Sequence, residues 1–222
     1  QWRAALGRGI EGARIGLWSW AWEQADPEIA RICRDALAEL EREGAELVDL
    51  EIPYSQYHQS LGVLAIGVEA VGLLHDAIHY FGEETGEDLR LVLEALSTID
   101  ARDYMIARRT RAGLRRSLAE AIRTVDLIAM PTVNMTAPSY TLAEDGQAIF
   151  DEHATTQLCR FAFLGNITGL PAGTVPVGLK DGLPVGLQLM GDAWDEASVF
   201  AAMAHCERMG LSELPPPRGY AG

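Results

Sequence analysis

Two histidines four positions apart are the first residues whose types and spacing could do chemistry. The segment HDAIH (residues 75–79) lies in an apolar stretch with a helical pattern, so His75 and His79 share one helix face and could both reach a metal ion. The zinc-protease motif has this spacing with a Glu after the first His, whereas Asp76 is one methylene shorter. No third ligand sits at a familiar spacing, although Glu69 is nearby. We therefore expect a solvated or packed helix face and no metal site.

Three arginines, Arg108, Arg111 and Arg115, fall on one face of a helix expected over residues 100–124. An arginine fork of this kind could bind a substrate carboxylate through paired hydrogen bonds, which a lysine cannot do. The alternative is a solvated face paired with acidic residues of the same helix, worth roughly a few tenths of a kcal/mol per pair. Spacing alone leaves both interpretations open.

A self-contained nucleophile is not expected. None of the eight serines lies in a G-x-S-x-G elbow or in a glycine-rich turn. Lys180 is the only lysine among the 18 basic residues, and it lies in a predicted hairpin turn. The chain therefore offers no serine in a turn that is typical of an activated nucleophile.

The stretch GNITGLPAGTVPVGLKDGLPVGLQLMG (residues 165–191) holds seven glycines and three prolines. It contains neither G-x-G-x-x-G nor G-K-[ST], so a phosphate-binding loop is not expected. Two apolar runs flank Lys180-Asp-Gly182, which is typical of a β-hairpin, and the side chains of residues 183–190 alternate between two faces. Gly178 and Gly186 leave room for a neighbouring backbone or helix. We interpret this stretch as packed strands.

The composition of the 222 residues is ordinary for a soluble globular chain, with 48% hydrophobic and 23% charged residues. A net charge of −14 argues against a nucleic-acid surface, because phosphate binding requires clustered cations. Three widely separated cysteines without a C-x-x-C pair favour a reducing, cytoplasmic location. No apolar run reaches about 18 residues, so we expect no membrane-spanning helix.

The elements that must position these residues alternate between strands and helices. Residues 13–20 predict a strand, 27–43 an amphipathic helix capped by Asp26, and 45–53 a second strand, which together form a βαβ unit with parallel strands. Residues 56–123 have a helical pattern that is broken near 82–88, and 125–131 predict a strand. A helix over about 151–164, the hairpin and a closing helix follow. This order indicates the α/β class.

Taken together, these segments resemble the C-terminal half of an amidase signature family enzyme. The hairpin stretch matches the family's N-x-x-G-x-P-x-x-x-V-P-x-G…G-L-P-x-G-x-Q-x-x-G pattern nearly position for position. VDLIAMPTVNMTAP is similar to the family's strand and loop, and ARDYMIARRTR to its Y-x-x-A-x-x-x-R helix. The likeness covers residues 8–209. It implies part of a large mixed β-sheet flanked by helices, and hydrolysis of amide C–N bonds.

The resemblance also implies which residues do what. The family's Ser–cis-Ser–Lys catalytic set precedes the part represented here, so no catalytic residue is expected in this chain and no cofactor is implied. In glutamine-using relatives an Arg at the place of Arg111 holds the substrate carboxylate. Thr132 would line the cleft at a strand end, and Asn166 would support the site by tying a strand to a loop.

The resemblance implies that residues 1–222 are the C-terminal portion of one amidase domain. Within it, 8–53 form the βαβ unit, 54–124 a helical segment, 125–209 the strands and helices that complete the sheet, and 210–222 a tail. The start at Gln1 is interpreted as that of a fragment or split subunit, inactive alone, whose partners are the N-terminal catalytic half and a small amide substrate, with a possible homo-oligomer.

Two alternatives to a general amidase stay open. One is the glutaminase component of a glutamyl-tRNA(Gln) amidotransferase, its A subunit, although no acidic residue occurs between His153 and Asn166, where that protein carries one. The other is a non-catalytic scaffold or binding subunit.

Overall fold

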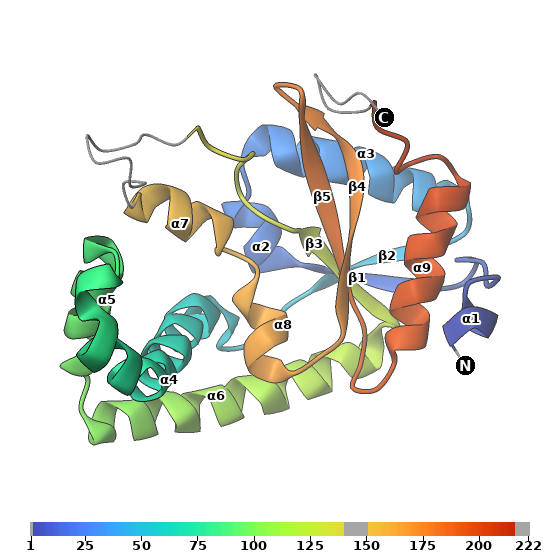
Figure 1. Cartoon of the computed structure of the whole chain (residues 1–222). Coiled ribbons are helices and arrows are strands. Elements are labelled where there is room, and N and C mark those ends of the chain that lie inside the picture. The colour runs from blue at the N-terminus through green and yellow to red at the C-terminus, as the bar shows by residue number, and fades with distance from the viewer. Residues whose placement is uncertain (1, 140–150, 216–222) are drawn as a thin grey trace.

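A five-stranded mixed sheet forms the centre of the computed structural model, which describes residues 2–139 and 151–215 (Figure 1). The strand order is β2-β1-β3-β5-β4. The strands are β1 Arg14–Trp18, β2 Glu46–Leu50, β3 Leu127–Pro131, β4 Ala172–Lys180 and β5 Leu183–Met190. β1 pairs in parallel with β2 and β3, whereas β5 is antiparallel to both β3 and β4. The expected mixed α/β architecture is confirmed.

Helices cover both faces of this sheet. They are α1 Trp2–Ala5, α2 Ser19–Gln24, α3 Pro27–Arg42, α4 His58–Phe81, α5 Glu87–Ser97, α6 Ala101–Ala121, α7 Glu152–Leu158, α8 Phe163–Thr168 and α9 Glu196–Arg208. One apolar core joins one sheet face to α3 and α9, and a second joins the other face to α6 and α8. Figure 1 shows α6 running beneath the sheet, with α4 and α5 projecting to one side.

Helix α3 forms where its local signals predict. The Asp26 side chain accepts hydrogen bonds from the backbone N–H groups of Glu28 and Ile29, and Pro27 occupies the first helical position. The chain leaves the helix through Gly44, whose φ of +98° favours glycine. Its predicted apolar stripe is buried in full: Ile29, Ile32, Cys33, Ala36, Leu37 and Leu40.

The hairpin also forms as expected. Val185, Leu187 and Leu189 of β5 are buried in the core beneath α3 and α9, and the intervening residues face the other side of the sheet. A Cβ on Gly178 would lie 2.6 Å from a methyl carbon of Ile32, so this glycine permits the close approach of α3.

The helix expected over about 151–164 is wrong as a single element. The structure has two short helices there, α7 and α8, separated by a turn at residues 159–162. The carbonyl oxygen of Arg160 contacts the ring of His58 at 2.6 Å, so it is bonded outside the helix that the sequence pattern suggested. The first part of the glycine-rich stretch, GNIT, belongs to α8.

The count of apolar residues in the sequence overlooked one segment that is long and apolar enough to span a membrane by length and composition. One helical segment in the described part of the chain, Ser55–Phe81, passes this test, with a mean hydropathy of 1.7 and 17% of the apolar window buried. The sequence count missed it because Glu69 and Asp76 interrupt the run without lowering its average greatly. A single helix of this kind is weak evidence for a membrane span, since core helices pass the same test.

Candidate functional site

A strip of small and polar residues lies on the sheet face opposite α3. The backbone N–H of Thr132, just after β3, donates to the carbonyl of Gly186 at 2.9 Å, and its hydroxyl lies 3.2 Å from that of Thr174 on β4. A Cβ on Gly186 would lie 2.7 Å from the Thr174 methyl carbon and 2.8 Å from the Thr132 hydroxyl. Glycine is therefore required here for the two threonines to meet above β5. Thr174 is exposed and the other two residues are half-buried, so this strip is an accessible surface.

One arginine of α6, Arg111, bonds to α8 beside this sheet. The Arg111 side chain donates from Nε to the backbone carbonyl of Ile167 at 2.5 Å, which fixes α6 to α8 and leaves the terminal NH2 groups of Arg111 as further donors. Arg115, one turn later, is exposed, as is Asn166 on α8. Arg111 therefore bonds to the residue that follows Asn166 on α8.

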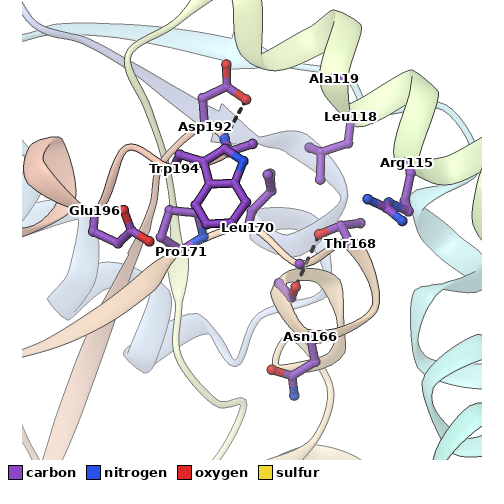
Figure 2. Close-up of a pocket in the computed structure, with 13 residues that line it drawn as sticks. Arg115, Leu118, Ala119, Asn166, Thr168, Leu170, Pro171, Asp192, Trp194 and Glu196 are labelled. Atoms are coloured by element: carbon purple, nitrogen blue, oxygen red, sulfur yellow. Dashed lines mark hydrogen bonds between the residues drawn. The ribbon is translucent and has the colours of Figure 1, made fainter.

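A cavity of about 530 Å³ opens next to that contact, which is within the usual size range of small-molecule sites. Arg115 and Asn166 line it on the side of α6 and α8, and Asp192, Trp194 and Glu196 line it on the side of the segment after β5 (Figure 2). Trp194 is 91% exposed and has a φ of +67°, which is uncommon for a large side chain. The cavity therefore offers an arginine, an indole ring and two carboxylates to a ligand.

The structure separates the three expected site residues. Arg111 joins α6 to α8 and does not line the cavity, whereas Asn166 on α8 does. Thr132 lies on the sheet strip and does not line the cavity. The sequence analysis did not single out Thr174 or Trp194. Thr174 carries a weak signal, since it alternates with buried Val175 along β4, but nothing local to Trp194 indicates its left-handed backbone.

The histidine pair of α4, His75 and His79, does not line the cavity described above. His75 contacts the adjacent Asp76 at 3.0 Å, and both side chains are exposed. Over residues 2–139 and 151–215, no three His, Cys, Asp or Glu side chains come together as metal ligands.

Lys180 forms an ion pair at the hairpin turn. Its Nζ lies 2.7 Å from Oδ1 of Asp26, the residue that caps α3, and the Asp26 backbone N–H donates to the Asn134 side chain at 2.6 Å. Burial raises the pKa of Asp26, but Lys180 and the capping N–H groups more than offset this, so the pKa is lowered from its ordinary value. The single lysine of the chain thus joins the hairpin to α3.

Replacing Asp26 by Asn is expected to lower the free energy of unfolding by about 1 kcal/mol or less at neutral pH, since Asn retains the helix cap but loses the ion pair. Because the folded pKa of Asp26 is lowered, the contribution of its charge is present above the unfolded pKa and is lost as the pH falls through the folded pKa. Urea denaturation of both proteins at several pH values measures this. Lys180→Met should have a similar effect at neutral pH, and a wild-type stability for both variants would contradict the ion pair.

Comparison with known proteins shows which families this chain resembles in sequence. The Amidase family model matches residues 2–200. The chain is 33% identical over 222 residues to the fatty acid amide hydrolase of Oryza sativa subsp. indica, covering 95% of this chain and 35% of that protein. It is 30% identical over 186 residues to an amidase of Pseudomonas putida, covering 80% and 39%. Glutamyl-tRNA(Gln) amidotransferases also match, with 32% identity over 232 residues to the Granulibacter bethesdensis protein.

A solved structure shows the same fold. A bacterial aryl acylamidase of the amidase signature family matches with a TM-score of 0.75 at 23% identity, covering 93% of this chain and 45% of that one. This chain spans about a third of the length of the rice relative and less than half of the aryl acylamidase. Because the Amidase family model matches residues 2–200 of the 222, this chain belongs to the amidase signature family.

Proposed function

We propose that this chain is the C-terminal part of an amidase that hydrolyses a carboxylic amide C–N bond to an acid and ammonia or an amine. It supplies sheet scaffold and part of the substrate pocket, and the N-terminal half of the same enzyme supplies the Ser–cis-Ser–Lys set. One observation carries the proposal: the match to the amidase model spans residues 2–200, while the only lysine is ion-paired to Asp26. The catalytic base must therefore come from outside these residues.

The accessible strip at Thr132, Thr174 and Gly186 supports this division of roles. A sheet face with small side chains lets another backbone come close. The serine-bearing segment of the N-terminal half would lie against this strip, with Thr132 at the edge of the cleft. Asn166 would then support the site from α8, through the helix that Arg111 holds.

We propose a general amide rather than glutamine as the substrate. The relatives include proteins named for fatty acid amides and for an aryl acylamidase, as well as the glutamyl-tRNA(Gln) amidotransferase. No acidic residue lies between His153 and Asn166 to receive the amino group of glutamine.

Arg111→Ala in the complete enzyme is expected to raise KM for amides that carry a carboxylate, at a cost of about 1.5–3 kcal/mol, and to spare neutral amides. The reason is that its terminal NH2 groups stay available to an anion while Nε is bound to α8. Steady-state kinetics on a matched pair of amides, one neutral and one anionic, measures the difference.

The matched control is Arg115→Ala, one helical turn along the same face. If Arg115 and not Arg111 binds the carboxylate, the selective rise in KM will follow the Arg115 variant. An equal loss on both amides for Arg111→Ala would make this residue structural. The broader proposal is tested by assaying amide hydrolysis by this chain with and without the N-terminal half.

A further inference from the structure

Trp194 is the most exposed large apolar side chain in the described part of the chain, at 91%. It lies between β5 and α9, in a turn closed by the backbone N–H of Asp195, which donates to the carbonyl of Asp192 at 3.0 Å. Trp194 is the third residue of this turn and has a φ of +67°, whereas Ala193 is not left-handed. Such a turn is of type II, which favours glycine or asparagine at this position. The backbone therefore does not account for a tryptophan here.

Neighbouring contacts hold this turn in place on both sides. The Asp195 side chain accepts a hydrogen bond from the backbone N–H of Ser198 at 3.2 Å, at the start of α9. Before the turn, the Gly191 N–H donates to the carbonyl of Pro171 at 2.9 Å. The indole of Trp194 is thus held at the surface in a fixed direction, where it adds little buried area to this chain.

The charged residues nearest to Trp194 along the cavity wall are acidic. Asp192 and Glu196 line the cavity with it, and Arg115 lines the side formed by α6 (Figure 2). Within residues 2–139 and 151–215, none of these three charged side chains forms an ion pair. The face of an indole ring attracts a cation, and two nearby carboxylates add to this attraction. This side of the cavity therefore suits the side chain of a lysine or an arginine.

The cavity continues into the accessible strip along β4. Leu170 and Pro171 line the cavity and lead directly into this strand. Thr174 follows Pro171 by three positions, which corresponds to about 10 Å along a strand. The α6 and α8 walls of the cavity cover the sheet face opposite α3, which is also the face of the strip. The cavity and the strip at Thr132, Thr174 and Gly186 are therefore neighbouring parts of one surface.

Charge and chain length favour one occupant for this surface. This chain spans 35% of the rice fatty acid amide hydrolase and 45% of the aryl acylamidase, so both relatives have many residues without a counterpart here. The serine-bearing segment of the N-terminal half is already proposed to lie on the strip. A second copy of this chain would bring another surface with a net charge of −14, and like charges repel.

We propose that Trp194 is the residue on which the N-terminal half of the enzyme docks, with a basic side chain of that half placed over the indole between Asp192 and Glu196. The docked half covers the open side of the cavity and buries the ring. The unusual tryptophan in the turn thereby serves the contact between the two halves. This inference rests on the proposed division of the amidase into an N-terminal catalytic half and this chain.

The direct test is hydroxyl-radical footprinting, read by mass spectrometry, of this chain and of the complete enzyme without substrate. Trp194 is expected to be oxidised readily in this chain and severalfold more slowly in the complete enzyme. Tyr80, 74% exposed on the projecting helix α4, is the reference and should react equally in both. Equal oxidation of Trp194 in both would overturn the proposal, as would protection of Tyr80 in its place. Protection of Trp194 in this chain alone that grows with concentration would identify a second copy as the occupant and also overturn it.

A second test compares the thermal stability of Trp194→Gly in the two proteins, with Tyr80→Ala as the control. Glycine suits the left-handed position, so the Tm of this chain should stay unchanged or rise. The Tm of the complete enzyme should fall by about 2–4 °C, because the variant loses a tryptophan buried at an interface. A lower Tm in this chain would mean that Trp194 stabilises its own fold. An unchanged Tm in the complete enzyme would mean that nothing docks on it.

Asp192→Asn tests for the basic side chain. The Asp192 Oδ1 accepts a hydrogen bond from the Ala193 N–H at 2.7 Å, which Asn can retain while losing the charge. The variant should lower the Tm of the complete enzyme more at low salt than at high salt, and have no such effect in this chain. A wild-type Tm for the complete enzyme at every salt concentration would contradict a basic partner at this place.

Footprinting and Tm require no catalysis, so the two proposals can fail separately. A complete enzyme without amidase activity in which Trp194 is protected would contradict the proposed function and leave the docking role standing. An active enzyme in which Trp194 reacts as it does in this chain would overturn the docking role alone.

Discussion

The 222 residues by themselves are expected to hydrolyse neither a simple aryl amide nor a fatty acyl amide above the uncatalysed rate. Joined to the N-terminal half, they should do so with the acceleration of an ordinary enzyme, at least about 10⁶-fold. The reason is that a serine in this family is activated through a deprotonated lysine. Lys180 is ion-paired to Asp26 at 2.7 Å, and an ammonium group has no electron pair to accept a proton.

Product release from both amides, followed for this chain, for the N-terminal half and for their mixture, measures this difference. The informative variant is Lys180→Met, which should weaken the contact between the hairpin and α3 and leave the activity of the mixture intact. Hydrolysis by this chain alone, abolished by Lys180→Met, would contradict the assignment and would make Lys180 the base.

Replacing Phe161 by Ala is expected to cost about 3–5 kcal/mol of unfolding free energy, enough to unfold many domains of this size. The ring is completely buried in the core beneath α6 and α8, with its centroid 6.3 Å from that of Trp20. Removing it leaves a cavity at the turn that joins α7 to α8, where surrounding side chains can relax only in part.

Phe81→Ala is the matched control. The same ring is removed from the end of α4, where Phe81 is 59% exposed, so the cost should stay within about 0.5 kcal/mol. Denaturant midpoints with unchanged slopes would measure both effects as stability differences. Similar small costs for the two variants would mean that the turn at residues 159–162 is not packed as described.

The elements that the sequence predicts well are those with local signals. Asp26, Pro27 and Gly44 set the ends of α3, and its apolar spacing predicts its buried face residue by residue. The turn at Lys180-Asp-Gly182 and the alternation along β5 similarly predict the hairpin. These signals act over a few residues, so they need no knowledge of the rest of the chain.

The interruption between α7 and α8 shows where such reasoning ends. The pattern over residues 151–164 is apolar enough for one helix, but the Arg160 carbonyl contacts His58, 102 positions earlier in the chain. The break depends on where α4 packs against this segment, and no local feature of residues 151–164 carries that information.

The sequence predicted the candidate site only in part, because contacts between residues far apart in the chain also form it. Arg111 was chosen from its helix face and its motif, yet its bond to Ile167 spans 56 positions. Thr174 became part of the strip only because β5 brings it over Gly186 to Thr132. Trp194 lines the cavity only because the segment after β5 passes beside α6 and α8.

The sequence by itself determined the family motifs, the α/β order of elements and the lack of a second lysine, since each is a matter of residue type and short spacing. Tertiary structure alone decided that Lys180 is committed to Asp26, that Arg111 is tied to α8 and that His58 meets two carbonyl oxygens. The physical reason is that hydrogen bonds and ion pairs form wherever packing brings their groups within about 3 Å. Which groups meet depends on how whole helices and strands bury their apolar faces.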